Sequence, residues 1–381
     1  MRKGFVALVV SASLLCLAGC FEAHYVSGAP DGTIMVSTGG RLFRVKGDMS
    51  EAVLIAEGVA RAEFSPDGER LLVVFEREDE NGRYAEVALC DADAKIETIL
   101  ARLHAPEGAN TYETFGAGMA AFLLRPRWSP DGAFVSWCWG GAAGGDVTNL
   151  HIREVEGSGQ LQVPNVSYGY AWSPDSSSVA VAVSSGNPDG LGALGTVQII
   201  DVRTGRVRHE LAGVLFEPQL CLGWDREGAA VLFSARAFEM PLDKDTLERS
   251  HLGIFMVDLE SGSVQMVTPP EVQSREWGAF AVSPDGAALV CTVGRSAGSE
   301  LRTELHTDVY TMALDGTEIE RIHAAPGILT PPRWLPGGGI VFGEEDSIHI
   351  ISPQGYRTDL MELISATVDR LDGRSPPPAA P

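Results

Sequence analysis

The sequence is poor in cysteine, in long apolar segments and in positive charge. It has six cysteines in 381 residues, and Cys90, Cys138, Cys221 and Cys291 stand far apart inside strand-like apolar runs. Isolated cysteines of this kind are usually small buried hydrophobic residues; a disulfide between neighbouring repeats is the alternative. The sequence contains no C-x-x-C pair and no histidine-rich cluster. It therefore predicts neither a metal site nor a cofactor.

Negatively charged residues outnumber positively charged residues in this chain. The 29 lysines and arginines stand against 51 aspartates and glutamates, which gives a formal net charge of -22 at pH 7. A surface of this charge repels nucleic acid and anionic lipid headgroups, so neither is expected as a partner. Hydrophobic residues make up 45% of the chain, enough for a core, and 43 glycines and 22 prolines predict many turns between short strands.

The long apolar segment of this chain lies at the amino terminus. Arg2 and Lys3 precede an apolar stretch from Phe5 to Leu17, which is the layout of a signal peptide and is too short to span a bilayer stably. Residues 17–20 read L-A-G-C, which resembles the lipobox of bacterial lipoproteins. The resemblance implies that residues 1–19 are removed and that Cys20 is lipidated. An ordinary secretory signal and an uncleaved helix are the alternatives.

Lipid on Cys20 would be the membrane attachment of the mature protein. Removal of residues 1–19 takes away two positive charges, so the remaining 381 - 19 = 362 residues carry a formal charge of -22 - 2 = -24. No later segment is apolar enough to span a bilayer, so the acyl chains would hold the protein at the membrane. Residue 21 is Phe rather than the Asp that retains enterobacterial lipoproteins in the inner membrane. This favours an outer-membrane location facing the periplasm.

One short phrase recurs along the mature chain. Complete copies read F-S-P-D-G at 64–68, W-S-P-D-G at 128–132, W-S-P-D-S at 172–176 and V-S-P-D-G at 282–286, and degenerate copies lie at 29–32, 224–228 and 334–338. The aspartate position moves from 31 to 337 in six intervals, or 306 residues at about 51 each. A fixed period of this length indicates an array of similar structural units.

Each phrase has the chemistry of a tight hairpin. Proline sets φ at the first corner and keeps the preceding serine extended, and glycine allows the positive φ at which the chain turns back. The β-rich runs that follow, such as 71–75 and 134–139, predict a buried strand after each turn. The aspartates recur because each unit needs the same turn, and a structural role is expected for Asp67, Asp131, Asp175 and Asp285.

A second alternating run follows in each unit, such as 197–202 before R-T-G. Four antiparallel strands in a repeated unit of about 50 residues predict an all-β propeller with seven four-stranded blades, with six or eight blades as alternatives. The S-P-D-G phrase with a trailing D-x-x-[TS]-G turn resembles the TolB-type, WD40-like propeller family over roughly residues 25–360. TolB carries an α/β domain ahead of its propeller, and the few residues between Cys20 and the first turn leave no room for one. This puts TolB's own partners in doubt for this chain.

The domain organisation follows from these segments. We expect a lipoprotein signal peptide at 1–19, a lipid anchor and linker at 20–27, one propeller domain at 28–362 and a tail at 363–381 that is disordered from about residue 375.

The connections of variable length are expected on one face of the propeller. They are the loops between second and third strands and the links between blades, at 76–83, 104–121, 140–147, 184–195, 236–251 and 294–306. Repeat proteins commonly place function on such a face. The binding candidates there are Glu78, Asp79, Glu80, Tyr112, Phe115, Asp189, Arg236, Phe238 and Arg295. Each could instead be a solvated loop tip, and the acidic run at 78–80 lacks the alternation of a calcium loop.

The sequence favours a monomeric cell-envelope lipoprotein that binds a protein partner through this long-loop face and catalyses no reaction. A small-ligand or glycan-binding propeller with a concave pocket is the first alternative. A hydrolase or lyase with its active site in the central funnel is the second. Such an enzyme would place a charged cluster on the propeller axis, with Arg127, Arg333 or His151 at the ends of inner strands.

One hydrolase-like motif is present. Residues 294–298 match G-x-S-x-G, with His306 and Asp308 nearby. A nucleophile elbow needs a strand, a sharp turn and a helix, whereas this segment joins two propeller strands. We therefore expect no catalytic role for Ser296.

Overall fold

The computed structural model describes residues 24–372 apart from 105–123, 140–147, 187–192, 217–220, 236–252, 269–275, 300–301, 327–328 and 345. The expected signal peptide at 1–19, Cys20 and the segment from 373 onward, including the tail expected to be disordered, lie outside the described residues. None of the described helical structure has the length and apolar character that a membrane-spanning helix needs.

The described chain is almost entirely β-strand, arranged in six antiparallel sheets. The first sheet contains β1 (Tyr25–Gly28), β2 (Ile34–Thr38), β3 (Arg41–Val45) and β4 (Ala52–Glu57), and the second contains β5 (Val59–Phe64), β6 (Arg70–Asp79), β7 (Gly82–Asp91) and β8 (Ile96–His104). The third contains β9 (Arg127–Trp128), β10 (Phe134–Trp139), β11 (Thr148–Glu154), β12 (Gln160–Trp172), β13 (Ser178–Gly186), β14 (Ala193–Asp201) and β15 (Val207–Phe216).

The remaining three sheets each have four strands in chain order. The fourth contains β16 (Leu222–Trp224), β17 (Ala230–Ala235), β18 (Gly253–Asp258) and β19 (Val264–Met266). The fifth contains β20 (Glu276–Val282), β21 (Ala288–Ser299), β22 (Arg302–Ala313) and β23 (Glu320–Pro326), and the sixth contains β24 (Arg333–Trp334), β25 (Ile340–Gly343), β26 (Ile348–Ile351) and β27 (Arg357–Asp359).

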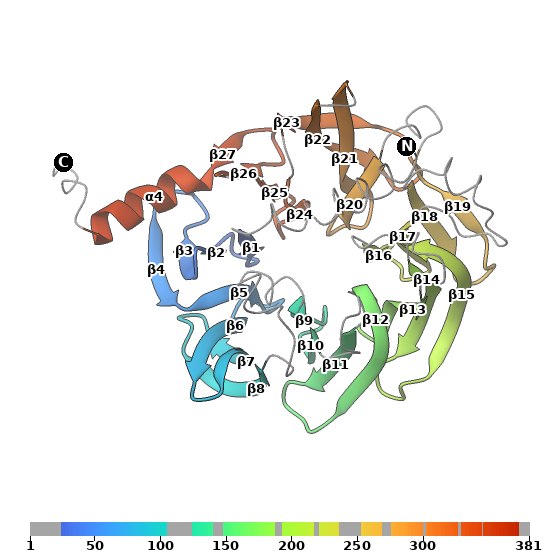
Figure 1. The fold of residues 1–381 in the computed structure, drawn as a ribbon, viewed down its shortest axis with the longest axis horizontal. Coiled ribbons are helices and arrows are strands. Elements are labelled where there is room, and N and C mark those ends of the chain that lie inside the picture. The colour runs from blue at the N-terminus through green and yellow to red at the C-terminus, as the bar shows by residue number, and fades with distance from the viewer. Residues whose placement is uncertain are drawn as a thin grey trace.

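The sheets form a ring with their first strands nearest the centre (Figure 1). This is the β-propeller that the repeats predict. The seven-stranded sheet arises because β12 serves two units: its first part pairs with β11, as in Leu161 with Ile152, and its end pairs with β13, as in Trp172 with Val179. Seven blades are obtained only by counting β12 twice, so the blade number remains a prediction.

All seven copies of the repeated phrase connect the first strand of a unit to its second. In the four complete copies the serine hydroxyl donates to the aspartate Oδ1 at 2.5–2.6 Å and accepts the backbone N–H five residues later at 2.9 Å. The same aspartate oxygen accepts the backbone N–H two residues beyond it. These bonds hold the turn closed by satisfying backbone groups that the hairpin leaves unpaired.

Neighbouring units contact one another at regular positions. Three of the four tryptophans that precede a turn donate the indole N–H to a carbonyl on the first strand of the preceding unit, as Trp128 does to Glu63 at 3.2 Å and Trp224 to Ala171 at 3.1 Å. Trp334 makes the equivalent bond to Ala281. The fourth, Trp172, donates to the hydroxyl of Ser136 at 2.9 Å. Tryptophan suits this position because its ring combines a large apolar surface with an N–H donor at its edge.

The ring is closed by apolar packing and by one helix. Strands of the first and sixth sheets share a buried cluster that includes Val26, Phe43 and Val341, and Leu360 and Ile364 of α4 (Leu360–Leu371) join it. Figure 1 shows α4 lying beside β4, and Thr367 donates to the carbonyl of Ala52 at 3.3 Å. The sequence pattern does not predict this helix, most of which falls in the segment expected to be a tail at 363–381.

The four cysteines among the described residues are free, as expected. Cys90, Cys138 and Cys291 are buried and Cys221 is half-buried. Burial raises the pKa of the Cys90 thiol to about 12 and that of Cys138 to about 11, so both stay protonated and unreactive near neutral pH.

Candidate functional site

The side chains that meet at the centre of the ring come from the first strands of the units. Tyr25 lies on β1, Glu63 on β5, Arg127 on β9 and Arg333 on β24, and these strands belong to four different sheets. Because side chains from four sheets of a ring can meet only near its axis, these residues mark the centre of the propeller. We call them, together with Arg61 of β5, the axial cluster.

The Tyr25 hydroxyl is the hub of the axial cluster. It donates to Glu63 Oε2 at 2.6 Å and accepts from Arg333 Nη1 at 2.8 Å and from Arg127 Nη1 at 3.2 Å. Arg127 Nη1 also donates to Glu63 Oε2 at 3.1 Å. A phenol has one donor and two acceptor positions, so the hydroxyl is fully used by these three partners.

The aromatic ring of Tyr25 carries two guanidinium groups. The Arg61 guanidinium lies 3.8 Å and that of Arg333 lies 4.4 Å from the ring centroid, within the range of cation–π attraction. Arg61 is only 4% exposed. Its Nη2 lies 3.6 Å from Glu63 Oε2, and its Nε has no hydrogen-bond partner. The site therefore holds a buried donor that is left unsatisfied.

Positive charge is in excess in the axial cluster. Glu63 Oε2 lies within 4 Å of two guanidinium groups, at 3.6 Å from Arg61 Nη2 and 3.1 Å from Arg127 Nη1, and Arg333, which contacts Tyr25, also attracts this carboxylate. Burial is the largest single influence on the pKa of Glu63 and raises it, but the attraction of Arg127 and Arg61 outweighs burial and lowers the pKa overall. For Arg333, burial and repulsion by Arg127 lower the pKa to about 9. Keeping Arg333 protonated therefore costs free energy, and an additional anion bound beside it would lower that cost.

The charged side chains occupy a fixed register. They stand one or three residues before the last residue of the first strand, which puts them on one side of the strand because side chains alternate. In the units on the far side of the ring the same positions hold small residues, namely Gly169, Ala171, Cys221, Gly223, Ala279 and Ala281. The cationic groups therefore lie on one side of the propeller axis. The residues across the axis from them have small side chains.

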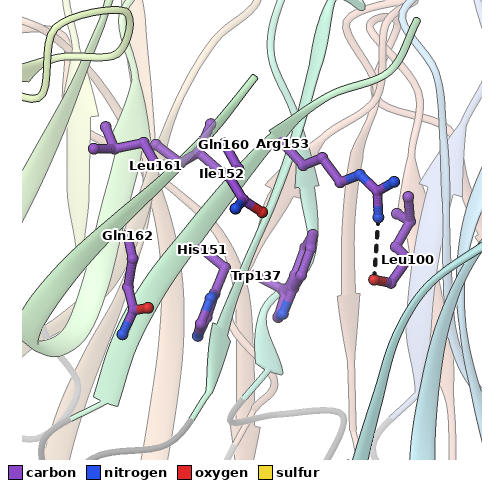
Figure 2. Close-up of a pocket in the computed structure, with 8 residues that line it drawn as sticks. All are labelled: Leu100, Trp137, His151, Ile152, Arg153, Gln160, Leu161 and Gln162. Carbon is purple, nitrogen blue, oxygen red and sulfur yellow. Dashed lines mark hydrogen bonds between the residues drawn. The ribbon is translucent and has the colours of Figure 1, made fainter. Parts of the chain in front are cut away.

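Arg127 and Arg333 lie where the funnel hypothesis requires, but the placement of His151 was wrong. His151 lies on β11, the third strand of its unit, and its ring stacks on Trp137 at 5.7 Å between centroids. Both side chains line a lateral cleft of about 300 Å³ between β8 and β11–β12 (Figure 2). Arg153 closes one end by donating to the carbonyl of Leu100 at 3.3 Å. Burial lowers the pKa of His151, and Arg153 is the charged side chain among the residues that line this cleft.

Two segments predicted as loops are paired strands. Residues 76–83 are the ends of β6 and β7, where Asp79 pairs with Gly82 across a two-residue turn, and 294–306 belong largely to β21 and β22. Backbone hydrogen bonding continues past the apolar core, which sequence hydrophobicity does not reveal. Glu78, Asp79 and Glu80 are exposed at the first hairpin tip, and Arg295 lies on β21. The other proposed binding residues lie outside the described residues: Tyr112, Phe115, Asp189, Arg236 and Phe238.

The exposed tip at 78–80 contacts its own hairpin and the end of β8, where His104 Nε2 lies 3.9 Å from Asp79 Oδ2. Asp79 Oδ1 accepts the backbone N–H of Asn81 at 2.8 Å, and Glu78 Oε2 lies 3.9 Å from Arg83. The serine of the G-x-S-x-G match lies within β21 and pairs with Leu305. This antiparallel hairpin lacks the strand–turn–helix geometry of a nucleophile elbow.

Comparison with known proteins shows the fold. TolB from Acinetobacter baumannii matches with a TM-score of 0.50 and 13% identity, covering 88% of this chain and 78% of TolB. Oligogalacturonate lyase from Vibrio parahaemolyticus matches with a TM-score of 0.56 and 11% identity, over 88% of this chain and 93% of the lyase. A prolyl endopeptidase matches at 0.54 and 12%, over 92% of this chain and 51% of that protein. No protein-family model and no curated protein sequence matches the chain.

The chain therefore has a TolB-like β-propeller fold, as the repeats indicated. The structural relatives include both TolB and propeller enzymes, so the fold leaves the function to be argued from the site. Sequence reasoning missed Tyr25, Arg61 and Glu63. The signal that could have identified Arg61 and Glu63 is the register: the first and third positions back from the end of the first strand hold charged residues in β5 and small residues in β12, β16 and β20.

Proposed function

We propose that the protein is a non-catalytic cell-envelope lipoprotein that binds a partner protein, and that a carboxylate-bearing segment of that partner enters the propeller and is held by the axial cluster. The main support for this proposal is the excess of guanidinium groups over carboxylates around Tyr25. In addition, the Nε donor of Arg61 has no hydrogen-bond partner. Guanidinium groups bind carboxylates through paired, charge-assisted hydrogen bonds. A cationic centre inside a protein of net charge -22 also confines anion binding to this place, because the outer surface repels anions.

The partner proposal is tested by crosslinking in cells followed by mass spectrometry. Wild type is compared with Arg127→Gln and Arg333→Gln, and with Arg208→Gln as a control that removes an exposed guanidinium far from the axis. We expect a specific envelope protein to be captured by wild type and by the control, and to be lost from both axial variants. Equal capture by all four proteins, or capture of nothing specific, contradicts the proposal. Thermal unfolding of each variant confirms that the propeller is intact.

We also propose that the protein is exported and held at the outer membrane by lipid on Cys20, facing the periplasm as a monomer. The support is the L-A-G-C box at 17–20 with Phe21 after it. The test is metabolic labelling with palmitate combined with membrane fractionation. Cys20→Ala should lose the label and move to the soluble fraction, and a variant that stays labelled in the membrane contradicts lipidation at this residue.

A funnel-site lyase or hydrolase is the second candidate. The observation that favours it is the axial cluster itself, since a charged cluster on the axis is what such an enzyme requires. Against this, the Tyr25 hydroxyl and the Glu63 carboxylate are already bonded to each other and to arginines, so neither stands ready as a general base. A turnover assay with acidic oligosaccharides and peptides distinguishes the two: turnover that is lost in Tyr25→Phe supports the enzyme.

A further inference from the structure

A second polar cluster lies away from the axis, between the fifth and sixth sheets. His323 comes from β23 of the fifth sheet, whereas Glu344 follows β25 and His349 lies on β26 of the sixth. One nitrogen of each imidazole and one carboxylate oxygen lie within 4.8 Å of one another. Nothing in the sequence predicts this grouping, because the three residues belong to different strands of two units.

The three side chains converge on a single point. His323 Nε2 lies 2.5 Å and His349 Nε2 lies 3.2 Å from the same oxygen, Glu344 Oε1. The His323 side chain is 7% exposed and that of His349 is 9% exposed, and both rings pack against the Phe342 ring at 4.9 and 5.5 Å between centroids. An apolar floor of this kind limits the rotamers of both imidazoles and fixes the direction of their nitrogens.

One nitrogen of the cluster lacks a hydrogen-bond partner. His349 Nε2 is buried and forms no hydrogen bond of acceptable geometry, although it lies 3.2 Å from the Glu344 carboxylate. Burying a polar atom without a hydrogen bond costs free energy. A bound cation would offset this cost, because the nitrogen would donate its electron pair to the cation and the Glu344 carboxylate would coordinate the same cation.

Two imidazoles and one carboxylate are a ligand set for divalent transition metals, with a fourth coordination position left open. A tetrahedral ion with bonds of about 2.0–2.1 Å separates its ligand atoms by roughly 3.3–3.5 Å. The two nitrogen–oxygen separations of 2.5 and 3.2 Å are shorter than that value, and all three ligand atoms lie within 4.8 Å of one another, so rotations that move the three side chains slightly apart suffice to admit an ion. We propose that His323, Glu344 and His349 form a site for a divalent transition-metal ion, which joins the fifth and sixth sheets next to the point of ring closure.

Arg357 of β27 competes with the ion for the same three side chains. Its Nη1 lies 2.9 Å from His323 Nδ1, its Nε donates to His349 Nδ1 at 3.3 Å, and its Nη2 lies 3.6 Å from Glu344 Oε1. A guanidinium that donates to both Nδ1 atoms places the imidazole protons on Nε2, the atoms that face Glu344. A metal-bound histidine carries its proton on the other nitrogen. The Arg357 side chain is 44% exposed and swings into solvent when the ion binds.

The test is calorimetric titration of the purified, chelator-treated full-length chain with Zn²⁺, followed by the visible spectrum of the Co²⁺ form. We expect one ion per chain and a tetrahedral Co²⁺ spectrum. His323→Gln and His349→Gln should each weaken Zn²⁺ binding at least tenfold, whereas Arg357→Gln should tighten it because the competing donor is gone. His209→Gln, an exposed histidine on β15, is the matched control and should change nothing.

The Arg357→Gln variant keeps the test informative if a histidine variant folds poorly, because it removes an exposed side chain and predicts a gain. No Zn²⁺ binding by wild type, binding that survives the double variant His323→Gln/His349→Gln, or an unchanged affinity in Arg357→Gln each overturns the proposal. In that case the cluster is a hydrogen-bonded histidine–glutamate–arginine network with no ion.

Discussion

Tyr25 and Arg333 are 308 positions apart in the chain, yet Arg333 Nη1 donates a 2.8 Å hydrogen bond to the Tyr25 hydroxyl. Tyr25 lies on the first strand of the first sheet and Arg333 on the first strand of the last. The bond therefore crosses the seam where the ring closes, and the axial cluster is also part of the structure that holds the seam. Binding and stability should be linked at this point.

Tyr25→Phe removes the hub hydroxyl and keeps the ring on which Arg61 and Arg333 stack. Three hydrogen bonds are lost and two arginines and a carboxylate lose a partner, so we expect the free energy of unfolding to fall by about 1–3 kcal/mol. Urea denaturation measures it. Tyr356→Phe, on a side chain that is 75% exposed, is the control and should leave the midpoint unchanged; an equal loss in both variants would contradict the role given to Tyr25.

Glu63 should make stability depend on pH in the acidic range. Its pKa in the folded protein lies below the ordinary value of 4.5, so the unfolded chain takes up a proton first as the pH falls. The stabilisation is therefore present above the ordinary pKa and is lost as the pH falls through the folded pKa. In Glu63→Gln this part of the pH dependence should be absent. Unfolding midpoints at several pH values between 3 and 7 test it, and parallel curves for the two proteins would refute the assignment.

Gly286 and Gly132 occupy the same turn position with φ of +69° and +72°, so an alanine at either suffers similar backbone strain. The two glycines differ in the free space around them. A Cβ at Gly286 would lie 2.8 Å from Arg226 Cα of the preceding turn, whereas at Gly132 the nearest atom is Pro66 Cδ at 3.7 Å. We expect Gly286→Ala to lower the thermal midpoint clearly more than Gly132→Ala. Equal losses in the two variants would contradict the close approach of Gly286 to Arg226.

Helix α4 should contribute to closing the ring. Ile364 is 1% exposed and packs in the cluster shared by the first and last sheets. Truncation of a buried isoleucine costs about 2–5 kcal/mol, so Ile364→Ala should be strongly destabilising in chemical denaturation. Leu371→Ala, at a helix position that is 57% exposed, is the matched control. A small effect at Ile364 would mean that the helix is not part of the cooperative fold.

The repeated turn made the propeller fold predictable from the sequence, but it did not indicate which residues form the axial cluster. Each S-P-D-G phrase is local, so proline, aspartate and glycine within five residues specify a hairpin and the period specifies the array. The axial cluster depends on where first strands from four sheets meet, which no short stretch of sequence encodes. Arg127 and Arg333 could be suggested from their position beside a turn. Tyr25 could not, because it lies four residues before the phrase at 29–32, in the segment 20–27 that was expected to be a linker and whose end instead forms part of β1.

The errors have physical causes of the same kind. His151 was misplaced because one isolated charge or ring in a strand does not reveal which strand of the unit it occupies. The segments 76–83 and 294–306 read as loops because they are polar, although antiparallel backbone pairing continues through them. Helix α4 was missed because its apolar face covers a seam that exists only in the closed ring.

Titration with succinate at constant ionic strength tests the central claim, that the axial cluster binds a carboxylate, most directly. Thermal unfolding of wild type should shift upward with succinate concentration, relative to sodium chloride of the same ionic strength. Arg333→Gln should weaken the apparent affinity at least tenfold, Glu63→Gln should strengthen it because the competing carboxylate is gone, and Arg208→Gln should match wild type. An identical response in Arg333→Gln, Glu63→Gln and Arg208→Gln would contradict the account.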